Sequence, residues 1–162
     1  VFLPGANMKP MRQNIFNPDF QDFIEALNVC EVAYILVGGY SVILHGYNRT
    51  TGDMDIWVKP SKENYDLLLA AFSKFGMSVF DMSLEKFLAP AHYDVFTFGR
   101  PPVSIDILTQ VSGLTFESTF ARAEWFEIST SLSVRALRLS DLMDAKKSAG
   151  RPKDLDDLEH LS

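Results

Sequence analysis

The pattern that most constrains this chain is a pair of aspartates in an otherwise apolar strand. Asp53 and Asp55 flank Met54, and the apolar run 56–58 follows. Residues two apart on a strand share a face, so both carboxylates project together, away from Met54. Adjacent carboxylates repel, and burying them is costly unless positive charge lies between them. The pattern predicts either a site for a hard cation, Mg²⁺ or Mn²⁺, or an edge strand with two solvated acids.

A second segment repeats this pattern and favours the metal site. In residues 103–108, apolar side chains alternate with others, and Asp106 faces away from the apolar set. If this strand neighbours the first, three carboxylates converge on one face. We therefore predict that Asp53, Asp55 and Asp106 are the catalytic and metal-binding residues. Asp94 lies in the preceding predicted strand and is expected to be structural or to support the site from outside.

A glycine pair ends the apolar run 34–37 and leads into a short predicted helix. Such a pair is commonly a tight turn. At the start of a helix, however, Gly38 and Gly39 also let a phosphate approach free backbone N–H groups. Ser41 adds a hydroxyl, and the glycines precede Asp53 by about one helix and one loop. We predict that Gly38, Gly39 and Ser41 form a phosphate-binding turn.

Two cations are candidates for the same phosphates. Arg49 lies shortly before the paired aspartates, and Lys146 lies in a predicted helix near the C-terminus. Arg49 is equally consistent with a surface arginine that balances the acids. Lys146 is also consistent with a positive charge that complements the end of a helix dipole. Both are predicted here as nucleotide-binding residues, with these structural alternatives open.

The remaining periodicities predict an α+β domain with a mixed sheet, flanking helices and a short helical C-terminus. We expect one domain over residues 8–162, with a helical appendage over 140–161, and residues 1–7 as a remnant or truncated end. Apolar runs and alternation predict strands at 34–37, 53–58, 92–98, 103–108, 125–128 and 132–136, and capping signals and helical spacing predict helices from 17, 40, 61, 116, 140 and 152.

Composition excludes several functions. The chain has 162 residues, with 15 basic and 21 acidic side chains and a formal net charge of −6. This charge argues against a broad nucleic-acid surface, although it permits a local phosphate site. One cysteine cannot form an internal disulfide, and the three histidines lie far apart. No apolar stretch is long enough for a membrane span and no signal peptide is visible, so we expect a cytoplasmic protein.

The order of these motifs resembles the nucleotidyltransferase superfamily with the polymerase-beta-like fold. The matching residues are Gly-Gly-x-Ser at 38–41, Arg-x-Thr-x-Asp-x-Asp-Ile at 49–56, and the later strand aspartate, Asp106. The chain is most similar to small bacterial nucleotidyltransferases, which include toxins of toxin–antitoxin and abortive-infection systems. Lys146 and the run 149–158 match their C-terminal signature. The resemblance spans roughly residues 34–161, and it departs in having Gly-Gly where many members have Gly-Ser.

The resemblance implies an activity. A Mg²⁺-dependent enzyme of this kind transfers a nucleoside monophosphate from an NTP to a hydroxyl of a small molecule, protein or RNA and releases pyrophosphate. Asp53 and Asp55 would bridge two Mg²⁺ ions, and Asp106 would complete the site. The alternative is a catalytically silent member that binds nucleotide or a partner protein, as in a toxin–antitoxin pair. The sequence leaves the acceptor and the nucleotide open.

Overall fold

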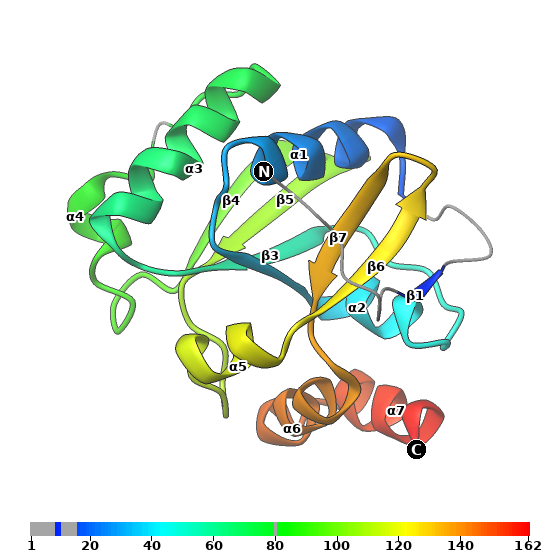
Figure 1. The fold of residues 1–162 in the computed structure, drawn as a ribbon. Coiled ribbons are helices and arrows are strands. Elements are labelled where there is room, and N and C mark those ends of the chain that lie inside the picture. Colours follow the sequence, from blue (N-terminus) through cyan, green and yellow to red (C-terminus); the bar gives the residue numbers. More distant parts are fainter. Residues whose placement is uncertain (1–8, 11–15, 80) are drawn as a thin grey trace.

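The computed structural model describes residues 9–10, 16–79 and 81–162, which form an α+β fold around one mixed sheet (Figure 1). Within these residues the strand order is β1-β6-β7-β2-β3-β5-β4. The strands are β1 (Lys9–Pro10), β2 (Tyr34–Val37), β3 (Met54–Val58), β4 (Val95–Arg100), β5 (Val103–Leu108), β6 (Glu124–Ser129) and β7 (Leu132–Ala136). The helices are α1 (Pro18–Val29), α2 (Gly38–Leu44), α3 (Lys62–Phe75), α4 (Leu84–Phe87), α5 (Phe116–Arg122), α6 (Leu139–Ala149) and α7 (Pro152–Leu161). The predicted fold class is confirmed.

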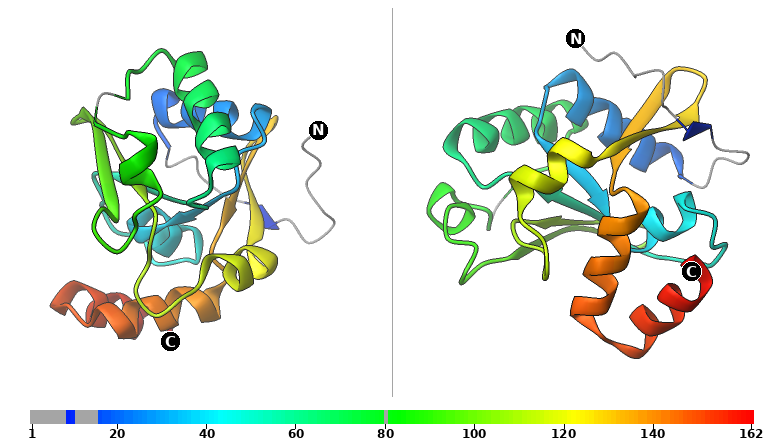
Figure 2. Two further views of the ribbon diagram at one scale, coloured as in Figure 1. Left: turned by 90° about the vertical axis from the view of Figure 1, so that its left-hand side faces the viewer. Right: turned by 60° about the horizontal axis from the view of Figure 1, so that its bottom comes forward.

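Helices cover both faces of the sheet. In Figures 1 and 2, α1 and α3 pack on one face, whereas α5, α6 and α7 lie on the other. The larger core lies under α1 and α3, where Phe23 packs edge-on against Phe72 with ring centroids 5.1 Å apart. On the opposite face, Trp57 packs edge-on against Phe116 at 5.2 Å. The sheet is therefore buried on both sides along most of its length.

Local sequence signals place the two long helices of the larger core. Asn17 caps α1, because its side chain accepts a hydrogen bond from the Phe20 N–H at 2.9 Å. Ser61 caps α3 in the same way through the Asn64 N–H, at 3.2 Å. Gly76 ends α3 with a φ of 86°, a left-handed conformation that glycine adopts without strain. The predicted starts of these two helices are confirmed.

The register of the central strands places the acids. β3 lies between β2, which is antiparallel to it, and β5, which is parallel. Asp55 stands opposite Val37 on β2 and opposite Asp106 on β5. Asp106 in turn stands opposite Thr97 on β4, which is antiparallel to β5. The two strands predicted to be neighbours are therefore adjacent, and their aspartates share one row of the sheet.

Some boundaries differ from the predictions for local reasons. β3 begins at Met54, so Asp53 precedes the strand. β4 begins at Val95 and not at residue 92, because the N–H groups of His92 and Tyr93 both bond back to the Ala89 carbonyl in a turn. The helix predicted from Ser140 begins one residue earlier, since α6 begins at Leu139. The two-residue β1 and the one-turn α4 were not predicted, and residues 1–7 lie outside the described residues.

Within the described part of the chain, no helix combines the length and the apolar character needed to cross a bilayer.

Candidate active site

Two carboxylates face each other across adjacent strands. Asp55 and Asp106 occupy directly opposite positions on β3 and β5. Burial, and then the charge of Asp106 and a hydrogen bond with it, raise the pKa of Asp55 to about 7. Asp53 is exposed just before β3 and adds a further negative charge that acts on Asp55. Asp55 therefore holds a proton more readily than an ordinary aspartate, and no ion pair with it is found among the described residues.

A threonine on the next strand completes this row. The Thr97 hydroxyl donates a 2.7 Å hydrogen bond to Oδ1 of Asp106. Thr97 is not predictable from the sequence as a site residue, because its position beside Asp106 follows from the β4–β5 register, which the sequence alone does not fix. Asp94, by contrast, pairs with Thr109: the Thr109 N–H donates a hydrogen bond to the Asp94 carbonyl. Asp94 therefore lies outside the row that contains the acid pair.

The glycine pair fits closely against the acids. Gly38 follows β2 with a φ of 69°, and a Cβ at this position would overlap the Asp55 carboxylate. A Cβ on Gly39 would overlap the Thr51 side chain. Only glycine therefore lets the turn approach Asp55. Because Gly38 and Gly39 have no side chains, the backbone of the turn is not shielded by a side chain of its own. Ser41 is fully buried in α2, and its hydroxyl has no hydrogen-bond partner among the described residues.

A cavity of about 200 Å³ lies between the ends of β2, β3 and β5 and helices α6 and α7. Its charged lining comes from Asp55, Lys146, Arg151 and Asp154. The remaining wall consists of Val37, Gly38, Leu108, Gln110, Val111, Ser112, Leu137, Leu142, Ala145 and Ala149. Of the predicted site residues, only three, Gly38, Asp55 and Lys146, are among those that line it.

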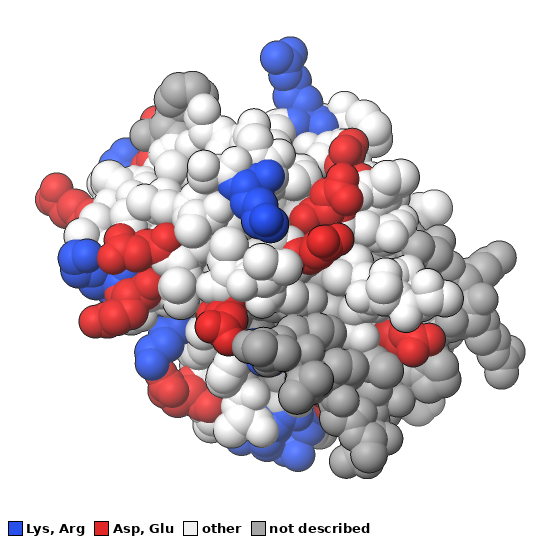
Figure 3. Space-filling view, turned by 45° about the horizontal axis from the view of Figure 1, so that its top comes forward, with Lys and Arg blue, Asp and Glu red and all other residues white. Residues whose placement is uncertain are grey.

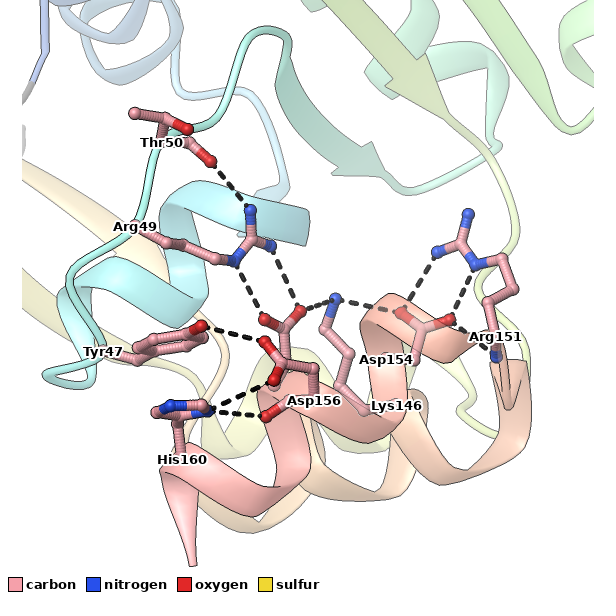
Figure 4. Close-up of polar contacts among 9 residues, drawn as sticks. Tyr47, Arg49, Thr50, Lys146, Arg151, Asp154, Asp156 and His160 are labelled. Carbon is pink, nitrogen blue, oxygen red and sulfur yellow. Dashed lines mark hydrogen bonds and ion pairs between the residues drawn. The ribbon is translucent and has the colours of Figure 1, made fainter.

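A buried ion network forms the helical side of this cavity (Figure 4). The Lys146 ammonium contacts Asp154 at 3.2 Å and Asp157 at 3.0 Å, and these three side chains are at most 7% exposed. Arg49 Nε lies 2.9 Å from Asp157, and Arg151 Nε lies 2.6 Å from Asp154. Burial acts to raise the pKa of Asp154, but Arg151 and Lys146 hold it below its ordinary value. The network joins α6, α7 and the loop after α2.

An exposed contact reinforces this attachment of α7. The Tyr47 hydroxyl donates a 2.8 Å hydrogen bond to Asp156, and the Tyr47 ring stacks on His160 with centroids 3.9 Å apart (Figure 4). Helix α7 is thus held to the loop after α2 by side chains from two of its turns.

The two predicted phosphate cations are engaged in this network. Arg49 pairs with Asp157, and Lys146 pairs with two aspartates. Their roles in binding phosphate stay predictions. The positive charges that act on Asp55 come instead from the start of α7: the exposed Lys153 lowers its pKa, and Asp55 in turn contributes to the raised pKa of Arg151.

The acid pair fits a divalent cation in its chemistry. Asp55 and Asp106 supply carboxylate oxygens, the ligands that Mg²⁺ prefers, and their mutual repulsion would be relieved by positive charge. In the described residues, no group of three or more acid, histidine or cysteine side chains is gathered closely enough to hold a metal ion by itself. Mg²⁺ usually takes one or two carboxylates and completes its shell with water and substrate phosphates, which suits a pair.

The opposite side of the molecule has a different charge pattern. On the face shown in Figure 3, Lys and Arg side chains alternate with Asp and Glu, and the described residues form no continuous basic strip there. Three acids of α1, Asp19, Asp22 and Glu25, border a shallow hollow together with Lys74 of α3. This face offers no concentrated positive charge for a nucleic-acid backbone.

The mixed sheet, the glycine turn and the facing aspartates define a nucleotidyltransferase-like fold. A family model described as "Nucleotidyltransferase of unknown function (DUF6036)" matches residues 19–161, and the chain belongs to this family. A crystal structure from Thermotoga maritima, described as a "putative nucleotidyltransferase", is similar with a TM-score of 0.57 at 17% sequence identity, over 87% of this chain and 88% of that one. This likeness concerns the fold. Among proteins with curated descriptions, none matches.

Proposed function

We propose that this chain transfers a nucleoside monophosphate from an NTP to a hydroxyl group and releases pyrophosphate. The observation that carries the proposal is the facing pair Asp55 and Asp106, beside a glycine turn and at the wall of a cavity that also contains Lys146. A partly buried carboxylate with a raised pKa next to a second acid is typical of a site that binds a cation or handles a proton. Membership of a nucleotidyltransferase family supports this interpretation.

Asp55 and Asp106, together with Asp53, would hold Mg²⁺ or Mn²⁺. When bound, the metal supplies positive charge that neutralises the triphosphate and lowers the pKa of the attacking hydroxyl. The chain contributes the carboxylates, and the Thr97 hydroxyl holds one of them in place by donating a hydrogen bond to Oδ1 of Asp106.

The other residues position the phosphates. The bare backbone of Gly38 and Gly39 lets phosphate oxygens come within reach of N–H groups near Asp55. Arg151 lines the cavity, and both Arg151 and Lys153 lie close enough to Asp55 to interact with its charge. The predicted contacts of Ser41, Arg49 and Lys146 belong to this proposal, with Lys146 held at the cavity wall by its two aspartates.

The proposed transfer forms one bond to phosphorus, breaks another and moves one proton. The acceptor hydroxyl oxygen forms a bond to the α-phosphorus, and the bond from that phosphorus to the oxygen bridging the α- and β-phosphates breaks. Pyrophosphate leaves with the electron pair of the broken bond. Asp106 accepts the proton of the acceptor hydroxyl and passes it to solvent. The acceptor is a small molecule, a protein or an RNA end.

The test uses the whole chain with each of the four NTPs, labelled at the α-phosphate, with Mg²⁺ and cell extract. Label should enter the protein, RNA or small-molecule fraction, and Asp55→Asn should reduce transfer by roughly a thousandfold or more. Asp66→Asn is the matched control, because Asp66 is an exposed residue of α3 paired with Lys62. Transfer that survives in Asp55→Asn overturns the assignment of this site.

A silent nucleotide-binding protein is the other outcome. In that case calorimetry detects binding of an NTP with Mg²⁺ to the wild-type chain, while no pyrophosphate is released in the presence of extract. Binding without release would replace the transfer proposal with a role in binding nucleotide or a partner protein.

A further inference from the structure

The two edges of the sheet differ in length. One edge is β1, which has two residues and ends in Pro10, a residue without a backbone N–H. The other edge is β4, which has six residues, Val95–Arg100. Unpaired edge strands pair with further strands unless they are short, covered or interrupted by proline. Only the β1 edge has these protective features in the described part of the chain.

The backbone of β4 is available for pairing. The Thr109 N–H bonds to the Asp94 carbonyl at 3.0 Å, which fixes the alternation of the β4–β5 ladder. Val95 and Thr97 consequently direct their N–H and C=O groups to the free side. A cavity of about 680 Å³ runs beside these residues, and the Val95 side chain is 50% exposed. The cavity is bounded on its other side by Gly76, Met77, Ser78, Asp81 and Lys86, so the free backbone groups of Val95 and Thr97 border a space between β4 and this segment.

The charges at the two ends of β4 identify the strand that fits. Asp94 and Arg100 are both exposed, and neither has an ion-pair partner among the described residues. In an antiparallel pairing of two β4 strands centred on Thr97, Asp94, just before the strand of each copy, comes level with Arg100 at the end of the other strand. Opposite charges in directly facing positions stabilise such a pair, whereas an in-register parallel pairing brings like charges together. We propose that two copies of this chain dimerise edge to edge through β4.

This pairing also places the candidate sites of the two copies on the same face of one sheet. The two-fold axis of a regular antiparallel pair is perpendicular to the sheet, so equivalent residues of both copies lie on the same face. The two Thr97 side chains become neighbours, and each already bonds to Asp106 of its own copy. Two β4 strands then separate the two β5 strands, which places the Asp106 positions about 14 Å apart at ordinary strand spacing. Both acid pairs would face one shared surface of a continuous sheet.

Sedimentation velocity over a range of micromolar concentrations tests the dimer. The wild-type chain should shift from monomer to dimer as its concentration rises. Val95→Pro removes an N–H that points to the free edge and leaves the bonds to β5 intact, so it should weaken dimerisation by about a hundredfold. Val95→Thr keeps both the N–H and the branched side chain and should dimerise like the wild type.

Charge exchange provides a test that does not depend on proline. Arg100→Asp places like charges opposite each other twice per dimer and should weaken dimerisation by about tenfold. Adding Asp94→Arg to that variant restores both pairs and should restore dimerisation. Circular dichroism checks that each variant is folded, and the charge variants decide the question if Val95→Pro is not. A monomer at every concentration overturns the proposal, as does a dimer that none of these changes affects.

Discussion

Asp55 on the sheet side and Asp154 on the helical side line the same small cavity, and their pKa values are shifted in opposite directions. On the sheet side, the pKa of Asp55 is raised to about 7, because burial and the neighbouring Asp106 disfavour its charge. On the helical side, the pKa of Asp154 is held below its ordinary value in spite of burial. The difference lies in the partners: Asp154 has Lys146 and Arg151 within ion-pair distance, whereas Asp55 faces another acid.

This contrast separates a structural from a functional use of the same residue type. The helical network contains its own cations, and so it is complete without a ligand. For the sheet pair, only Lys153 lowers the pKa of Asp55, and this does not outweigh burial and the neighbouring acids, so a bound cation would relieve the remaining repulsion. Residues arranged at a cost to stability are the expected mark of a site that binds or reacts. The following substitutions test this division, in decreasing order of expected effect.

The largest effect is expected from Asp157→Ala in the helical network. The change leaves the buried Lys146 with one partner and removes the anchor of Arg49, so the free energy of unfolding should fall by about 4 kcal/mol. Urea denaturation measures the loss. The adjacent Asp156→Ala is the control: Asp156 is half exposed and bonds to Tyr47, so its removal should cost about 1 kcal/mol or less. Equal losses would show that the network is not the main support of α7.

Gly38→Ala should destabilise the chain by about 3 kcal/mol. An added Cβ would overlap the Asp55 carboxylate, and the left-handed backbone adds strain for any residue but glycine. Gly46→Ala is the control, because Gly46 also has a positive φ, 107°, but no atom lies within 4 Å of its added Cβ. Thermal and urea unfolding give the stability loss of each variant. The difference between the two losses separates the effect of the Cβ overlap from that of backbone strain. A Gly38 variant no less stable than the Gly46 variant would contradict the close approach of turn and acid.

Sequence patterns were sufficient to predict the strands that carry the acids and the faces they expose. Alternation around Asp55 and Asp106 depends on the two-residue period of a strand, and the structure has both residues in one row. The adjacency of β3 and β5 was an assumption, because pairing joins segments about fifty residues apart. Asp53 shows the limit of the pattern: it has the right spacing but precedes the strand and is exposed.

The helical network was harder to predict. Asp154 and Asp157 are polar residues on a short helix, and such residues usually form a solvated face. They are buried because Lys146 on α6 and Arg49 on a distant loop meet them in the folded chain. The motif with Lys146 indicated that this segment matters, but whether its charges bind one another or a phosphate depends on the packing of three segments. Thr97 was missed for the same reason, since its role comes from register.

Asp55→Asn should stabilise the chain by about 2 kcal/mol above neutral pH, without divalent metal. The folded pKa of Asp55, about 7, exceeds its ordinary value of 3.8, so the folded state binds more protons between these values. The wild-type free energy of unfolding should therefore fall as pH rises from about 4 to about 7, and the variant should lose this slope. Urea denaturation at several pH values measures it, with Asp66→Asn as control. A slope that persists in Asp55→Asn would mean that another group causes it.

The smallest effect is expected from Thr97→Val, which removes the hydrogen bond to Asp106 and keeps the shape and backbone of the side chain. The free energy of unfolding should fall by about 1 kcal/mol, because the hydroxyl supports a carboxylate that faces a second acid. Thr97→Ser retains the donor and should stay near the wild type.

A double-mutant cycle with Asp55→Asn shows whether this hydrogen bond belongs to the acid pair. If Thr97 acts by stabilising the charge of Asp106 against that of Asp55, its contribution should shrink once Asn occupies position 55. An unchanged contribution, or equal losses for the valine and serine variants, would mean that Thr97 supports the strand and not the acids. The acid pair would then have no stabilising neighbour on the sheet, and its dependence on positive charge from outside the chain would be greater still.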